Sequence, residues 1–201
     1  MSEFGMLAQA FEFSKINNVV GDYFEFGLWR GKTFRYAYRL RRRYDLKTMH
    51  LWGFDSFQGL PAFLDDRDNI WNKGQFACDE SELRRILRRG GLSERDYTLI
   101  PGFYQESLND ELHDRLKGKS AAVMYVDCDL FESAQAVLTF SERYLVNGTI
   151  VCFDDFHNYK SSPHQSEQRA LKEFLSQNHG LHFEPYFNYS PLGKSFVVRR
   201  D

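Results

Sequence analysis

The stretch Ala121-Ala122-Val123-Met124-Tyr125-Val126-Asp127 (AAVMYVD) decides the fold. Its first six residues are all apolar or aromatic, which is typical of a central strand of a parallel sheet, buried on both faces. Further strand-like runs alternate along the chain with helix-like segments. This alternation predicts an α/β sheet with helices on both faces. The expected strands are 23–26, 49–55, 97–100, 121–127 and 148–153.

The remaining segments complete this pattern. Two runs near the C-terminus, His182–Phe187 and Lys194–Arg200, predict a hairpin-like pair that would make the sheet mixed. Residues 56–79 form a loop long enough to indicate a functional role. The pattern predicts helices over about 6–17, 32–44, 80–90, 105–116, 132–145 and 164–178.

Composition excludes several classes of protein. A formal net charge of -2 and a pI near 6.3 argue against a nucleic-acid binder. The basic runs at 35–44 and 82–91 lie late in expected helices, where arginines face solvent. No signal peptide is recognisable, and no apolar stretch approaches the ~18 residues of a membrane span. The three cysteines lack the spacing of a metal site, so we expect a reducing, cytoplasmic setting.

Acidic residues gather where the expected strands end. In an open α/β sheet, ligands bind beyond the carboxyl ends of the strands, at the point where the strand order reverses. Adjacent carboxylates repel each other, so an acid pair at the end of a buried strand needs an explanation. The acids at four strand ends are Glu25, Asp55, Asp127, Asp154 and Asp155.

The first strand leads into a glycine turn. Gly27 follows the strand and Gly31 opens the next helix, and glycines allow a ligand to approach the backbone closely. The spacing matches neither GxGxxG nor a P-loop, so an NAD-linked oxidoreductase is the weakest alternative. Asp55, 28 residues after Gly27, is placed to accept the hydroxyls of a ribose. A helix-capping aspartate would look the same.

Five motifs are specific enough to indicate a family. In chain order they are GDYFEFGLWRGKT, GFDSFQGLP, PGFYQESL, YVDCDLFES and IVCFDDF. Together they resemble the macrocin O-methyltransferase (TylF/MycF-type) family of class I, S-adenosylmethionine-dependent methyltransferases. The resemblance runs from about Gly21 to Phe174. It implies a Rossmann-like fold with a seven-stranded, mostly parallel sheet and a C-terminal antiparallel strand. It also implies one methyltransferase domain over 1–201, with an N-terminal helix or extension at 1–20 and a catalytic core at 21–201.

The resemblance implies where the cofactor binds. Glu25, Gly27 and Gly31 would line its methionine part. Asp55 would bind the ribose. Aromatic and glycine residues after the third strand would border the adenine. Trp29 could also shape the substrate pocket or simply pack, and we favour packing for it. The full set implied to bind S-adenosylmethionine is Glu25, Gly27, Trp29, Gly31, Thr33, Asp55, Ser56, Gly102, Phe103 and Asp127.

The resemblance also implies a divalent cation, usually magnesium, held by Asp127, Asp154 and Asp155. Hard cations prefer oxygen ligands, and a metal there would cancel the repulsion within the acid pair. The alternative is that Asp154 caps a turn and Asp155 is solvated. The metal would chelate substrate hydroxyls. The candidates for a general base are Asp127, Asp129 and His157, and a surface histidine without chemistry explains His157 equally well.

The sequence therefore predicts a magnesium-dependent O-methyltransferase that acts on a hydroxyl of a small molecule, a sugar or another natural product. The alternative is a non-catalytic, methyltransferase-like protein that binds the cofactor or a partner. We expect no membrane or nucleic-acid partner and leave a homo-oligomer open. About twenty residues precede GDYFEF, fewer than in family members acting on macrolide sugars, so the resemblance does not identify the acceptor.

Overall fold

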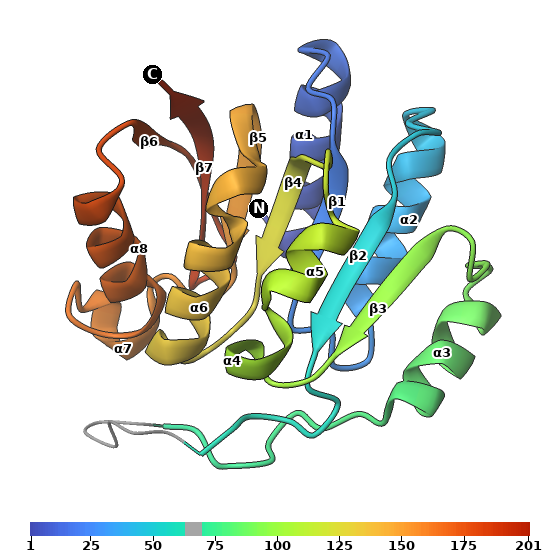
Figure 1. Ribbon diagram of the computed structural model, residues 1–201, viewed down its shortest axis with the longest axis horizontal. Coiled ribbons are helices and arrows are strands. Elements are labelled where there is room, and N and C mark those ends of the chain that lie inside the picture. Colours follow the sequence, from blue (N-terminus) through green and yellow to red (C-terminus); the bar gives the residue numbers. More distant parts are fainter. Residues whose placement is uncertain (63–69) are drawn as a thin grey trace.

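Seven strands form one sheet in the computed structural model, which describes residues 1–62 and 70–201 (Figure 1). The order across the sheet is β3-β2-β1-β4-β5-β7-β6. The five strands from β1 to β5 run parallel, whereas β7 is antiparallel to both of its neighbours. The expected mixed sheet is thus confirmed. The strands are β1 Asp22–Phe26, β2 Leu51–Asp55, β3 Tyr97–Pro101, β4 Ala121–Val126, β5 Leu145–Phe153, β6 Leu181–Tyr189 and β7 Gly193–Arg200.

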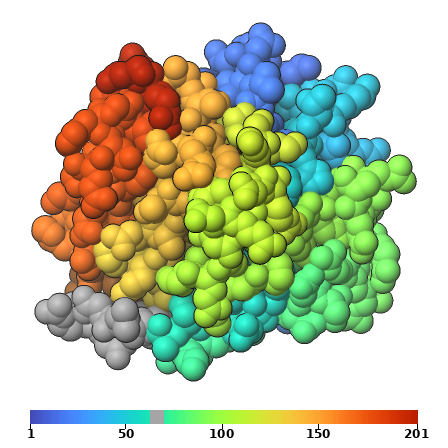
Figure 2. Space-filling model, in the orientation of Figure 1, coloured from blue at the N-terminus to red at the C-terminus, as the bar shows by residue number. Residues whose placement is uncertain are grey.

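Helices cover both faces of this sheet. Those on the face viewed in Figure 2 lie side by side as a layer of α5, α6 and α8, while α1 and α2 lie behind the sheet in Figure 1. No described helix has both the length and the apolar character needed to cross a bilayer. The helices are α1 Glu3–Ile16, α2 Lys32–Arg43, α3 Glu80–Arg89, α4 Tyr104–Ser107, α5 Asp110–Arg115, α6 Phe131–Ser141, α7 Asn158–Ser161 and α8 Ser166–Gln177, with a 3-10 turn η1 Glu142–Tyr144.

Two helix predictions need correction. The helix expected over 105–116 is two short helices, α4 and α5, because the Asn109 side chain accepts a hydrogen bond from the Leu112 N–H at 3.0 Å and starts a new helix. The helix expected over 132–145 ends at Ser141, and β5 begins at Leu145 rather than at 148. The short helix α7 was not expected at all.

The central strand β4 connects two apolar cores. Every residue of β4 is buried. Met124 and Val126 belong to the core packed with α5, α6 and α8, whereas Val123 and Tyr125 belong to the core packed with α1, α2 and α3. The continuous apolar run in the sequence therefore reflects burial on both faces, as predicted.

The strand order reverses between β1 and β4, and the chain leaves both strands at the same edge. The Gly27 N–H donates to the Phe54 carbonyl at 3.0 Å, and the Asp127 N–H donates to the Phe26 carbonyl at 2.9 Å. Gly27 has a φ of +90°, and a Cβ there would lie 2.0 Å from the Asp127 carbonyl oxygen. Only glycine fits this crossing of the two backbones.

We expect Gly27→Ala to destabilise the fold by at least about 3 kcal/mol, because left-handed strain adds to a backbone clash that cannot relax locally. The matched control is Gly118→Ala, where φ is +76° and no atom lies within 4 Å of the new Cβ. Strain alone should cost the control about 1–2 kcal/mol. Urea unfolding of both variants checks this, and equal losses would contradict the clash.

Candidate functional site

A cavity of about 290 Å³ opens at the carboxyl edge of the sheet, beside the strand-order reversal. It gathers most of the residues that the sequence pointed to. Four of them, Glu25, Gly31, Thr33 and His157, do not line it. The predicted residues in its wall are Gly27, Trp29, Asp55, Ser56, Gly102, Phe103, Asp127, Asp129, Asp154 and Asp155.

Asp55 holds the glycine turn in place. Its Oδ2 accepts from the backbone N–H groups of Leu28 at 2.7 Å and Trp29 at 3.1 Å, and its Oδ1 accepts from the Phe57 N–H at 2.7 Å. Burial raises the pKa of Asp55, and these three bonds oppose that rise. Trp29 has a φ of +42°, a conformation that a bulky side chain adopts only where its surroundings enforce it. The carboxylate of Asp55 provides that enforcement.

Glu25 lies behind the turn, inside the protein. Its side chain is fully buried and accepts hydrogen bonds from the Tyr23 hydroxyl and, at 2.6 Å, from the Thr33 hydroxyl. Burial raises the pKa of Glu25 to about 8. Thr33 lies in the first turn of α2, so this carboxyl group ties the start of that helix to β1. Its predicted role in holding the cofactor stays a prediction.

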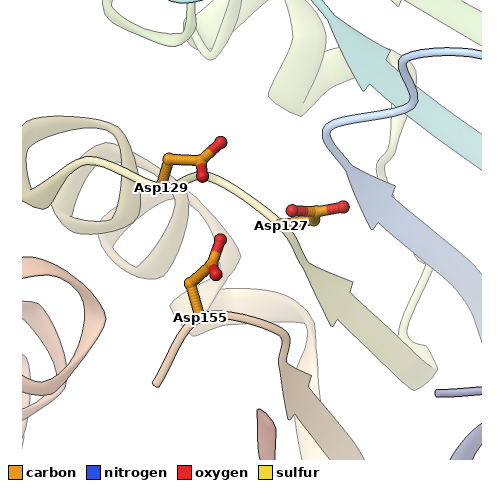
Figure 3. A group of neighbouring side chains, drawn as sticks. All are labelled: Asp127, Asp129 and Asp155. Carbon is orange, nitrogen blue, oxygen red and sulfur yellow. The ribbon is translucent and has the colours of Figure 1, made fainter. Parts of the chain in front are cut away.

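Three carboxylates that line the cavity lie close together (Figure 3). Asp127 and Asp129 follow β4 and Asp155 follows β5, and one oxygen of each lies within 4.8 Å of the others. Burial raises the pKa of all three. Neighbouring negative charge raises the pKa further for Asp127 and for Asp129, where it reaches about 9, whereas hydrogen bonds to Asp129 and Asn158 oppose the rise at Asp155. Asp129 and Asp155 share a hydrogen bond. We call Asp127, Asp129 and Asp155 the acid trio.

Asp154 lies in the cavity wall but outside the trio. Its Oδ1 accepts a hydrogen bond of 2.6 Å from the Tyr125 hydroxyl on the neighbouring strand, and burial raises its pKa to about 6. Adjacent residues at a strand end point to opposite faces, so Asp154 and Asp155 face different surroundings. The structure thus groups Asp129, rather than the predicted Asp154, with Asp127 and Asp155.

His157 lies away from the cavity. Its Nδ1 is 2.8 Å from the Ser161 hydroxyl, and its Nε2 is 3.3 Å from the Asn188 side-chain oxygen. Both ring nitrogens are therefore engaged with the turn around α7 and the end of β6. These contacts are those of a residue that holds a turn, so the geometry does not bring His157 to the acids.

Sequence reasoning missed two parts of the site. The first is Phe76, whose ring lies 5.6 Å from that of Trp29 and 5.5 Å from that of Trp71. All three line the cavity, where the chain before α3 passes along the carboxyl ends of the strands (Figure 1). We call Trp29, Trp71 and Phe76 the aromatic wall. A lone phenylalanine in a loop carries no signal that would have identified it.

The second missed residue is Glu167. It is fully buried, and burial together with the charges of Asp155, Asp154 and Asp129 raises its pKa well above the usual value. In the sequence it is an acid in the first turn of a helix, which is ordinarily a solvated residue favoured by the helix dipole. Only the packing of α8 brings it beside the acids.

We expect Glu25→Gln to flatten the pH dependence of stability. The folded-state pKa of about 8 exceeds the usual 4.5, so this group favours folding fully below pH 4.5 and progressively less up to about pH 8. Glutamine mimics the protonated acid and should remove a stability loss of about 3–5 kcal/mol across that window. Urea unfolding at pH 5 and pH 8 checks this, with the exposed Glu111→Gln as control. An unchanged difference between the two pH values would contradict it.

Curated relatives of the chain are O-methyltransferases. It is 31% identical over 147 residues to demethyldecarbamoylnovobiocin O-methyltransferase of Streptomyces niveus, covering 70% of this chain and 54% of that protein. It is 28% identical over 165 residues to mycinamicin III 3''-O-methyltransferase of Micromonospora griseorubida, covering 78% of this chain and 63% of that protein. The chain thus spans less than two thirds of the length of these relatives.

A solved structure of an O-methyltransferase has the same fold as this chain. The O-methyltransferase NovP superposes with a TM-score of 0.81 at 25% identity, over 96% of this chain and 78% of that one. The sheet order and the antiparallel β7 are those expected of the class I methyltransferase fold. The family model of macrocin O-methyltransferase (TylF) matches residues 3–182. Because this match covers most of the chain and includes all five motifs, the chain belongs to the macrocin O-methyltransferase family.

Proposed function

We propose that the protein is an S-adenosylmethionine-dependent O-methyltransferase that needs Mg²⁺ and acts on a hydroxyl of a small natural product, in particular a sugar. One observation carries the proposal: a single cavity contains both the glycine turn with its strand-end acid and the acid trio. The two relatives named above, one of them a mycinamicin 3''-O-methyltransferase, support the substrate class.

The near wall of the cavity suits the cofactor. Gly27 has no side chain between its backbone and the cavity, Asp55 ends β2 with Ser56 next to it, and Gly102 and Phe103 follow β3. A strand-end acid matches a ribose, and an aromatic ring matches the face of an adenine. We assign these five residues to S-adenosylmethionine. Asp55 keeps the turn in place through backbone bonds, and it would bind the ribose from the same position.

The acid trio fits a magnesium ion. Three carboxylates within 4.8 Å of one another, two of them buried, offer the hard oxygen ligands that Mg²⁺ takes in proteins. Asp127 and Asp155 belong to both the geometric trio and the set that the family resemblance implies. The third ligand is Asp129 by geometry and Asp154 by resemblance, and we propose Asp129.

S-adenosylmethionine supplies an electrophilic methyl group, and bound Mg²⁺ lowers the pKa of a chelated hydroxyl. In the transfer a C–O bond forms to the acceptor oxygen as the C–S bond breaks, and the hydroxyl proton leaves. Asp127 and Asp155 would hold this ion, which would orient the acceptor oxygen. Asp129, which lies within 4.8 Å of both and is hydrogen-bonded to Asp155, is the candidate to take the proton. The aromatic wall lines the same cavity and would help to keep water away from a bound acceptor.

Isothermal titration with S-adenosylmethionine, with and without Mg²⁺, tests the function. We expect saturable binding of the cofactor to the unmodified protein. We also expect Mg²⁺ to bind to the protein that is already loaded with S-adenosylhomocysteine. Absence of cofactor binding under both conditions would rule out the proposed function. Cofactor binding without any binding of Mg²⁺ would favour a metal-independent or non-catalytic protein.

Replacing single carboxylates identifies the ligands. We expect Asp155→Asn and Asp129→Asn each to raise the Kd for Mg²⁺ by at least about tenfold, while the Kd for S-adenosylmethionine changes little. Asp154→Asn should raise the Kd for Mg²⁺ by clearly less than either of these changes, because it removes a nearby negative charge but no proposed ligand. The exposed Asp114→Asn serves as control. If Asp154→Asn instead raised the Kd for Mg²⁺ more than Asp129→Asn, Asp154 would be the third ligand. Asp129 would then be a candidate general base but not a metal ligand.

A further inference from the structure

The first turn of α8 reaches both acid-bearing loops. Three consecutive side chains are involved, each with a different contact. The Ser166 hydroxyl donates to the Asp129 carbonyl at 2.9 Å. The Oε2 of Glu167 accepts from the Asp155 backbone N–H at 3.1 Å. The third side chain, Gln168, donates from Nε2 to the carbonyl of Phe156 at 2.7 Å and to the Ser161 hydroxyl at 2.9 Å.

These contacts are not ordinary helix capping. The residue that precedes α8, Gln165, makes no side-chain capping bond, so the start of the helix is not stabilised in the usual way. The side chains of the first turn are directed to other segments of the chain instead. Ser166 therefore links α8 to the loop after β4, and Glu167 links it to the loop after β5.

Backbone strain lies at the same contacts. Asp129 has a φ of +57° and Ser166 a φ of +48°, and the hydrogen bond between them joins two left-handed residues. Such conformations are unfavourable for residues other than glycine and persist only where the surroundings determine them. The left-handed turn at Asp129 lies in the loop that carries two members of the acid trio. The bond from Ser166 is one of the contacts that hold it.

Glu167 has a further peculiarity. Its side chain is fully buried, yet its Oε1 has no hydrogen-bond partner among the residues that the structure describes. An unused buried carboxylate oxygen costs free energy unless something nearby offsets it. Its other oxygen bonds to Asp155 of the trio. A cation in the trio would offset this cost, which accounts for a fourth carboxylate at this place.

We propose that Ser166, Glu167 and Gln168 form a clamp that fixes the loop after β4 against the loop after β5, with Glu167 as the positioning residue that orients Asp155 towards a metal ion in the acid trio. This inference rests on the proposed function, because it assumes that the trio binds Mg²⁺. Residues that orient metal ligands contribute to affinity without touching the metal, and their loss typically costs 10–100-fold in affinity.

Three clamp variants test the proposal through the Kd for Mg²⁺. This Kd is measured by isothermal titration and by the displacement of bound Mn²⁺, which is followed by the electron paramagnetic resonance signal of Mn²⁺. Glu167→Ala removes the acceptor for the Asp155 N–H, so we expect Kd to rise about 10–100-fold. Glu167→Gln keeps an oxygen that can accept this bond, so Kd should stay within about threefold. Ser166→Ala removes one neutral hydrogen bond and should raise Kd about three- to tenfold.

The control is Glu173→Gln on the same helix, where the carboxylate pairs with Arg169 at 2.8 Å, and it should leave Kd unchanged. Thermal unfolding in the presence of a chelator reports whether each variant folds. If Glu167→Ala does not fold, the smaller changes Glu167→Gln and Ser166→Ala decide.

Two results would overturn the clamp. One is a folded Glu167→Ala or Ser166→Ala variant that binds Mg²⁺ like the parent. The other is a Glu167→Gln variant whose Kd for Mg²⁺ rises as much as that of Glu167→Ala. The charge of Glu167, rather than the hydrogen bond that positions Asp155, would then determine the affinity. A parent protein that binds no Mg²⁺ would overturn the proposed metal site itself. That result is obtained before any variant is made, so it is distinct from a failure of the clamp.

Discussion

The close approach of the Gly27 backbone to the Asp127 carbonyl is the contact on which the site depends. It lies where β1 and β4 diverge at the reversal of the strand order. Because no side chain separates the two backbones, the loop after β1 and the loop after β4 lie next to each other and both line one cavity. One wall carries the glycine turn held by Asp55, and the other carries the acid trio. Without this crossing, the residues that we propose to bind the cofactor and the acid trio would not line the same cavity.

The acids at this edge are stabilised in different ways. Asp55 accepts hydrogen bonds from three backbone N–H groups, Glu25 accepts them from two hydroxyls, and Asp154 accepts one from the hydroxyl of Tyr125. These carboxyl groups therefore have protein donors that replace water. Within the acid trio the interactions are largely between carboxyl groups, with the Asn158 amide donating to Asp155 at 2.7 Å. Buried carboxylates that lie close together repel each other unless some of them are protonated or a cation neutralises their charge. This difference in partners is what supports a metal at the trio.

Much of the fold could be predicted from the sequence, because the strands of a buried parallel sheet have continuous apolar runs and the turns between them have polar and glycine residues. The prediction of one helix over 105–116 was wrong, because a periodic pattern does not reveal that Asn109 starts a second helix. The strand ends and the sequence motifs were enough to locate most of the residues that line the cavity. The sequence did not show that Asp129 groups with Asp127 and Asp155 while Asp154 bonds to Tyr125, because this depends on which side chains meet in the folded protein. The predicted role of Asp154 as a metal ligand stays a prediction. Phe76 and Glu167 carried no signal at all.

The sequence by itself determined the α/β architecture, the family and the edge of the sheet where the acids lie. These follow from local periodicity and from motifs of adjacent residues, which a chain carries before it folds. Only the tertiary structure decided that Glu25 is enclosed behind the turn, that Asp129 joins Asp127 and Asp155, and that α8 contacts both acid loops. Those facts depend on distances between residues as far apart in the chain as Asp129 and Ser166. Such distances are set by packing of the whole sheet and its helices, and no local pattern encodes them.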